Sequence, residues 1–86
     1  MQQEKKDIIL KSIASTIKRL RGTKSQYLLG GEYGIAPSIL SDIEREVKDP
    51  QLTTLFKLAG AFNLSISQFM QELEKDLPDG FTMYDD

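Results

Sequence analysis

The chemistry open to this 86-residue chain is limited by the absence of two residue types, His and Cys. Without them the sequence lacks the commonest general base, the thiolate nucleophile and the usual zinc ligands. Three carboxylates lie close together at Asp42, Glu44 and Glu46, but helical spacing points them in different directions. We therefore expect no enzymatic activity, no catalytic residue, no cofactor and no metal site. The chemistry that remains is hydrogen bonding and charge pairing by exposed polar side chains.

The middle of the chain carries these polar residues within a regular pattern of apolar and glycine positions. An apolar pair precedes Gly30, a position where two helices must touch, and Gly34 follows in a turn. Pro37 then suits the first turn of a new helix, whose apolar period resumes at Leu40. Two short helices joined by a glycine-containing turn form the unit that places its second helix in the DNA major groove. The spacing therefore predicts a helix-turn-helix motif over about residues 25–45.

The charge of the chain is divided unevenly along its length. The net charge of −2 disfavours phosphate, but residues 1–48 hold nine Lys/Arg against six Asp/Glu, and residues 49–86 hold two against seven. The basic half coincides with the predicted motif, so a positive surface for phosphate is compatible with the acidic total. Ordinary scatter of charge in a small domain gives the same imbalance, and this alternative stays open.

Five helices are predicted to position these residues, and strand signals are nearly absent, so the expected fold class is all-α. The helices are expected at about residues 5–21, 26 to 32 or 33, 37 to 45 or 46, 52–62 and 65–77. The fourth helix is expected to be capped by Thr53 or Thr54, or by Gln51. The chain has room for one domain, at residues 1–78, followed by a short acidic tail at residues 79–86 that is either a frayed tail or a small docking segment.

The second helix is predicted to be intrinsically weak because it contains two consecutive glycines. Gly30 and Gly31 each lower helix propensity by about 1 kcal/mol relative to Ala. Gly30 has a packing reason, since a glycine permits close approach of two backbones. The sequence shows no such reason for Gly31. Tertiary contacts must therefore hold this helix in place.

The predicted motif and the segments on either side of it resemble the helix-turn-helix family of phage repressor and Cro proteins, also called the xenobiotic-response-element (XRE) regulators. The similarity runs without a gap from about residue 17 to residue 69 and covers about two-thirds of the chain. It is carried by Lys18, Arg19, Leu20, Arg21, Ser25, Gln26, Leu29, Gly30, Gly34, Ile35, Ser38, Leu40, Ser41, Ile43, Glu44, Arg45, Pro50, Leu52, Thr54, Leu55, Lys57, Leu58, Ala59, Ala61, Phe62, Leu64 and Ser65. The resemblance implies a five-helix lambda-repressor-like DNA-binding domain, in which the second and third helices form the motif.

The resemblance also implies a function, that of a sequence-specific transcriptional regulator with its third helix in the major groove of a double-stranded DNA operator. It implies that the outward side chains of the third helix face the bases, and that Gln26 touches the DNA backbone. Glu44 is expected to orient the end of the third helix through hydrogen bonds. The candidate DNA-binding residues are Arg21, Lys24, Gln26, Ala36, Pro37, Ser38, Ser41, Asp42, Arg45 and Lys48.

Four residues depart from the family's pattern. Pro37 cannot donate a hydrogen bond to a base, and Asp42 can only accept one, which suits a cytosine amino group or repels phosphate. Ala36 stands where a Ser or Thr usually caps the third helix, which weakens that end by about 1 kcal/mol. Glu46 replaces the frequent glycine that closes the helix. Base readout is therefore expected to be sparse, with specificity coming from the two serines of the third helix and from DNA shape.

The apolar face of the fifth helix motivates the expectation of a homodimer. This face runs from Ile66 to Leu77 and exceeds what one core needs, which leaves Met70, Leu73 or Leu77 available for a second copy. Such a dimer would bind half-sites about one DNA turn, ~34 Å, apart. The alternative is that the whole face lies within the core of one chain.

A second function stays open beside DNA binding, that of a protein-interaction module or the antitoxin of a toxin-antitoxin pair. It is indicated by the acidic C-terminal half and by Phe81, Met83 and Tyr84, which offer a docking segment to a protein partner. No apolar run is long enough for a signal peptide or a bilayer span. We therefore expect a cytoplasmic, nucleoid-associated protein with no membrane partner.

Overall fold

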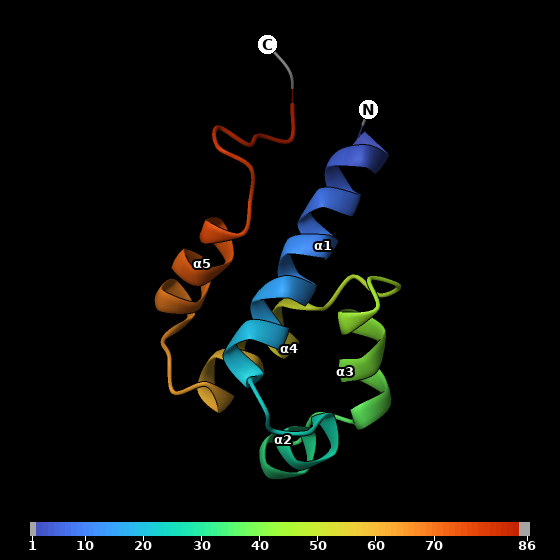
Figure 1. Cartoon of the computed structure of the whole chain (residues 1–86), viewed down its shortest axis with the longest axis vertical. Helices are drawn as coiled ribbons and strands as arrows, with labels where there is room; N and C mark the ends of the chain where they lie inside the picture. The colour runs from blue at the N-terminus through green and yellow to red at the C-terminus, as the bar shows by residue number, and fades with distance from the viewer. Residues whose placement is uncertain (1, 85–86) are drawn as a thin grey trace.

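The computed structural model describes residues 2–84, and every regular element in this range is a helix (Figure 1). The helices are α1 (Gln2–Arg21), α2 (Gln26–Tyr33), α3 (Pro37–Glu44), α4 (Leu52–Ala61) and α5 (Ile66–Lys75). Figure 1 shows α1 along the long axis of the molecule, with α2 at one end and the two ends of the described chain at the other. The predicted all-α fold with five helices is therefore confirmed.

Five helix ends differ from the predicted ones, including the end of α4 at Ala61 and the start of α5 at Ile66. α3 ends at Glu44, before the predicted residue 45 or 46, because Glu46 takes a left-handed φ of 66° that a right-handed helix cannot continue. α5 ends at Lys75 rather than near Leu77, since Pro78 disfavours helical geometry in the residue before it. α1, in contrast, begins three residues earlier than expected.

The N-terminal ends of α4 and α5 differ in their capping hydrogen bonds. Ser65 precedes α5, and its Oγ accepts a hydrogen bond from the Gln68 backbone N–H at 3.1 Å. The Gln68 side chain accepts from the Ser65 N–H at 2.9 Å, which completes a capping box. α4 is preceded by Gln51, whose side chain makes no capping bond. Thr53 and Thr54, the other candidates, lie inside that helix.

Each helix contributes side chains to one buried apolar cluster. Its members are Ile13, Ile17, Leu29, Ile35, Leu40, Ile43, Leu58, Ala59, Phe69 and Leu73. Ile66 and Met70 of α5 pack against this cluster, and Leu73 is only 8% exposed. The expectation that Leu73 is available to a second copy is therefore wrong, because most of the apolar face of α5 covers the core of its own chain.

A polar seam joins α1 to the C-terminal end of α5. The Thr16 hydroxyl donates to Asp76 Oδ2 at 2.5 Å, and the Ser12 hydroxyl donates to the Asp76 carbonyl at 3.1 Å. Arg19 reaches the same carboxylate at 3.1 Å and Glu72 at 2.8 Å. The hydrogen bond from Thr16, supported by Arg19, holds the pKa of Asp76 below its ordinary value. Arg19 therefore fastens α1 to α5 in the free protein.

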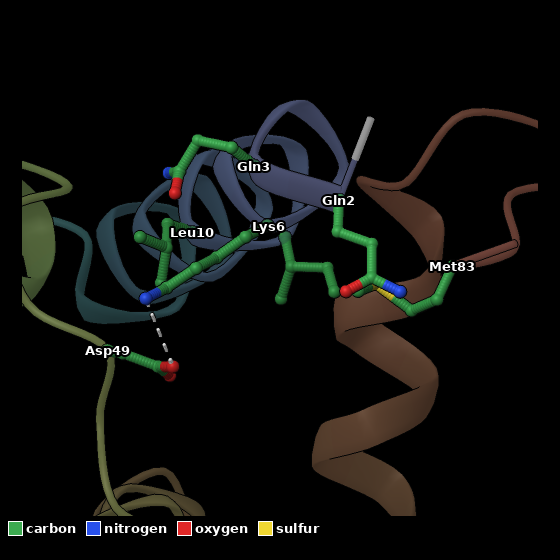
Figure 2. A pocket seen from close by; sticks show the side chains of 7 residues that line it. Gln2, Gln3, Lys6, Leu10, Asp49 and Met83 are labelled. Carbon is green, nitrogen blue, oxygen red and sulfur yellow. Dashed lines mark ion pairs between the residues drawn. The ribbon is translucent and has the colours of Figure 1, made fainter.

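The described part of the acidic tail folds back onto α1. The Lys5 ammonium lies 5.3 Å from the centre of the Phe81 ring, within the range of a cation-π contact. Figure 2 shows Met83 beside Gln2 at the rim of a hollow of about 410 Å³, with Lys6 and Asp49 on the other side. The described part of the tail therefore contacts α1 through Phe81, and Met83 lies beside the start of α1. The last two residues of the tail, 85–86, lie outside the described residues.

Candidate nucleic-acid interface

The predicted motif is formed by α2, a short turn and α3. Ser25 caps α2, as its Oγ accepts a hydrogen bond from the Leu28 N–H at 3.1 Å. α2 ends at Tyr33, and the next residue, Gly34, has a left-handed φ of 71° and donates its N–H to the Gly30 carbonyl. The turn then leads directly into α3, so the predicted order of helix, glycine turn and helix is observed.

Gly30 sets how closely this turn folds back on α2. A Cβ atom built on Gly30 would lie 2.1 Å from the carbonyl oxygen of Ile35, far inside van der Waals contact. The Ile35 N–H also donates to the Gly30 carbonyl at 2.9 Å, and the Ile35 side chain is buried. The close approach predicted at Gly30 therefore exists, although the neighbour is the turn backbone rather than a crossing helix. Gly31 has no such neighbour.

α3 presents one face to the core and another to solvent. Leu40 and Ile43 are buried, whereas Ser38 is exposed and Ser41 and Asp42 are partly exposed. Pro37 occupies the first turn, and Ala36 precedes it as an N-cap without a side-chain hydrogen bond, as the sequence predicted. The outward positions of α3 therefore lie where a DNA groove can reach them.

A buried ion pair fixes α3 relative to the end of α1. Arg21 donates from Nε and Nη2 to the two oxygens of Glu44, at 2.9 and 2.7 Å. Glu44 is 4% exposed, so this carboxylate depends on Arg21 for its charge partner. Arg21 Nη1 also donates to the Lys24 carbonyl at 2.7 Å, which ties in the loop before α2. The orienting role predicted for Glu44 thus has its partner in Arg21, which sequence reasoning had given to phosphate.

The exposed basic residues near α2 and α3 are also paired with carboxylates. Arg45 Nη2 lies 2.7 Å from Asp42 Oδ1, and Lys24 Nζ lies 3.1 Å from Glu32 Oε1. Lys48 is exposed and has no ion-pair partner within residues 2–84. The i,i+3 spacing of Asp42 and Arg45 was the sequence signal for the first of these pairs. The surface around α3 is therefore less positive than the count of basic residues predicted.

Several large apolar side chains remain exposed outside the core. Tyr27 and Leu28 lie on the first turn of α2, beside Gln26, and are 74% and 55% exposed. Leu52 and Phe56 lie four residues apart on α4, which places them on the same helix face. The sequence pattern did not predict that Leu28, Leu52 and Phe56 face solvent.

Within the described range, no group of three or more His, Cys, Asp or Glu side chains is arranged to hold a metal ion. In the same part of the chain, each helix is either too short or too polar to cross a lipid bilayer.

Comparison with known proteins agrees with this geometry. A family model described as Helix-turn-helix matches residues 17–69, which is more than half of the chain and includes α2, the turn and α3. The comparison with curated proteins found no match, and neither did the comparison with solved structures. The chain therefore belongs to the Cro/repressor-like helix-turn-helix family, a family of DNA-binding regulators.

Proposed function

We propose that this protein is a sequence-specific transcriptional regulator that inserts α3 into the major groove of an operator. The observation that carries the proposal is the outward face of α3, where Ser38, Ser41, Asp42 and Arg45 lie exposed or partly exposed. The contact of Gly30 with the turn holds this helix against α2, and the buried Arg21 to Glu44 pair holds its far end. A rigid recognition helix of this kind needs no rearrangement to enter a groove.

The other candidate residues fall into two groups with different roles. Lys24, Gln26, Arg45 and Lys48 are exposed or partly exposed, and we assign them to phosphate contacts that fix the protein on the duplex. Ala36 and Pro37 have short side chains that allow the start of α3 to approach the bases. Arg21 keeps Glu44 neutralised, so we assign it to positioning α3 rather than to a phosphate.

The internal ion pairs give the proposed binding a recognisable salt dependence. Lys24 must exchange Glu32 for a phosphate, and Arg45 contacts a phosphate through the N–H groups that Asp42 leaves unused, so each gains less than an unpaired lysine would. We expect Arg45→Ala combined with Lys48→Ala to weaken binding to all duplexes alike and to flatten the salt slope by about one to two units. Lys11→Ala, a charge change on an exposed part of α1, serves as the control.

The experiment that tests DNA binding is a titration of backbone amide resonances with a random-sequence duplex at low salt. Shifts concentrated on Gln26 and residues 36–48 would support the proposed interface. An absence of shifts at low salt would refute it, and equal salt slopes for the wild type and the double variant would refute the phosphate contacts.

We also propose that the regulator acts as a homodimer on an approximately palindromic operator in the cytoplasm, at the nucleoid. Met70 of α5 and Leu77 just beyond it are partly exposed, and Leu52 and Phe56 of α4 are exposed, so these apolar side chains support the proposed contact. Sedimentation of the protein with and without operator DNA tests it. A monomer at high micromolar concentration without DNA, together with a single copy per operator in the sample with DNA, would remove the dimer from the proposal.

A protein partner, such as the toxin of a toxin-antitoxin pair, is the second candidate. The observation in its favour is the exposed pair Tyr27 and Leu28 on α2, together with the exposed Tyr84 at the end of the described tail. Such a partner predicts resonance shifts at these residues with cell extract and none with DNA. Deletion of residues 79–86 shows which of these two surfaces binds the partner, because it removes Tyr84 and leaves Tyr27 and Leu28 of α2 in place.

A further inference from the structure

The outward face of α3 carries an acidic side chain, Asp42, at a position that would face DNA. Its Oδ1 accepts a hydrogen bond from Arg45 Nη2 at 2.7 Å, and the two side chains are 38% and 65% exposed. The other carboxylate oxygen, Oδ2, receives no hydrogen bond from the described residues. Asp42 is therefore held in place by Arg45 while it keeps one oxygen available to a donor.

A carboxylate in the major groove discriminates strongly among bases. Phosphates, guanine O6 and N7, adenine N7 and thymine O4 are all acceptors or negative groups, and they repel it. The amino group of cytosine, N4, is a donor without an adjacent acceptor on the same base edge, and it is the natural partner of Asp. A wrong base leaves the charge desolvated and unpaired, so the penalty is larger than for a neutral side chain.

We propose that Asp42, positioned by Arg45, is the specificity-determining residue of this protein and selects cytosine at one position of each half-site. This inference rests on the proposed function, because it needs α3 to lie in the major groove. Ser38 lies one turn before Asp42 on the same side of α3, and its hydroxyl accepts or donates and so excludes no base by itself. The structure thus assigns discrimination to Asp42 and anchoring to its neighbours.

The test begins with selection of duplexes from a random library by the wild-type protein. Affinities are then measured for the four bases at each position of the selected half-site, for the wild type, Asp42→Asn and Asp42→Ala. We expect the wild type to prefer cytosine at one position by roughly 5- to 100-fold. Asp42→Ala should lose this preference and bind the other three sequences more tightly, and Asp42→Asn should shift it toward adenine, the usual partner of Asn.

Asp49→Asn is the matched control, because it removes the same charge from an exposed loop carboxylate outside α3. It should leave every base preference unchanged. If Asp42→Asn instead raises affinity equally for all four bases, Asp42 only repels phosphate and the inference is overturned while DNA binding stands. If the wild type binds no duplex at low salt, the proposed function itself fails, and this inference fails with it.

Discussion

The two adjacent glycines of α2 provide the sharpest test of how this motif is built. Beyond the neighbouring backbone of its own helix, no atom lies within 4 Å of the position that a Cβ would take on Gly31, so Gly31→Ala adds only the helix propensity of alanine. We expect it to raise the free energy of unfolding by about 0.5 to 1 kcal/mol. Gly30→Ala gains the same propensity, but its Cβ would lie 2.1 Å from the Ile35 carbonyl oxygen.

The size of the destabilisation expected for Gly30→Ala follows from the atom that the new Cβ would contact. A backbone carbonyl cannot rotate away as a side chain does, so the turn must shift and carry the buried Ile35 with it. Overpacking of this kind costs about 1 to 3 kcal/mol, and strain on the hydrogen bond from Ile35 to Gly30 adds about 1 kcal/mol. After the gain in propensity, we expect a net loss of about 1 to 3 kcal/mol.

Urea unfolding followed by far-ultraviolet circular dichroism measures both variants under identical conditions. Unchanged m values would show that the folded and unfolded states have kept their exposed areas, so that midpoints can be compared directly. The two variants should differ by about 2 to 4 kcal/mol, with opposite signs relative to the wild type. Equal stabilisation by both alanines would refute the close approach of the turn to Gly30.

Other predictions concern the helix ends and the polar seam. Glu46→Gly should stabilise the protein by about 1 kcal/mol because φ is 66° there, whereas Asn63→Gly, at φ 59°, should gain less because Asn tolerates this region; urea unfolding compares them. Ala36→Ser should add about 1 kcal/mol in the same assay by supplying the missing cap, and no gain would contradict the observed N-cap. The lowered pKa of Asp76 means that its contribution to stability is complete above about pH 4 and is lost as the pH falls through its folded-state pKa; Thr16→Val should flatten this acid loss in unfolding curves recorded across that range.

Features that act over a few residues could be predicted from the sequence. Ser25 and Ser65 cap helices through backbone groups three residues away, so their identity and position were sufficient. The need for glycine at Gly30 was also visible, because the spacing of the motif predicts a close backbone approach there, although the predicted neighbour was a crossing helix and the observed one is the turn. Pairs that join distant segments were not visible. Arg21 and Glu44 are separated by 23 residues, and only folding brings the end of α1 to the end of α3.

For the polar seam between α1 and α5, the sequence shows which polar residues are buried but does not show what they bind. Ser12 and Thr16 lie on the apolar face of α1, which marks them as buried polar residues that need partners. The partner, Asp76, follows 60 residues after Thr16 and lies just beyond α5. The apolar period of α5 was ambiguous for a related reason, since periodicity identifies an apolar face without identifying what covers it.

The difference between charge content and charge placement decides how this protein can recognise DNA. The count of basic residues in the first half of the chain is compatible with a phosphate-binding surface, but the structure pairs Arg21, Lys24 and Arg45 with carboxylates. Each pair lowers the attraction to phosphate that is common to all sequences, because the carboxylate offsets the positive charge of its partner. In the proposed complex, the Asp42 carboxylate also penalises incorrect bases more than correct ones. Weak attraction to any duplex combined with a strong penalty for wrong bases raises the ratio of specific to non-specific affinity, which is the quantity that selects an operator among competing sites.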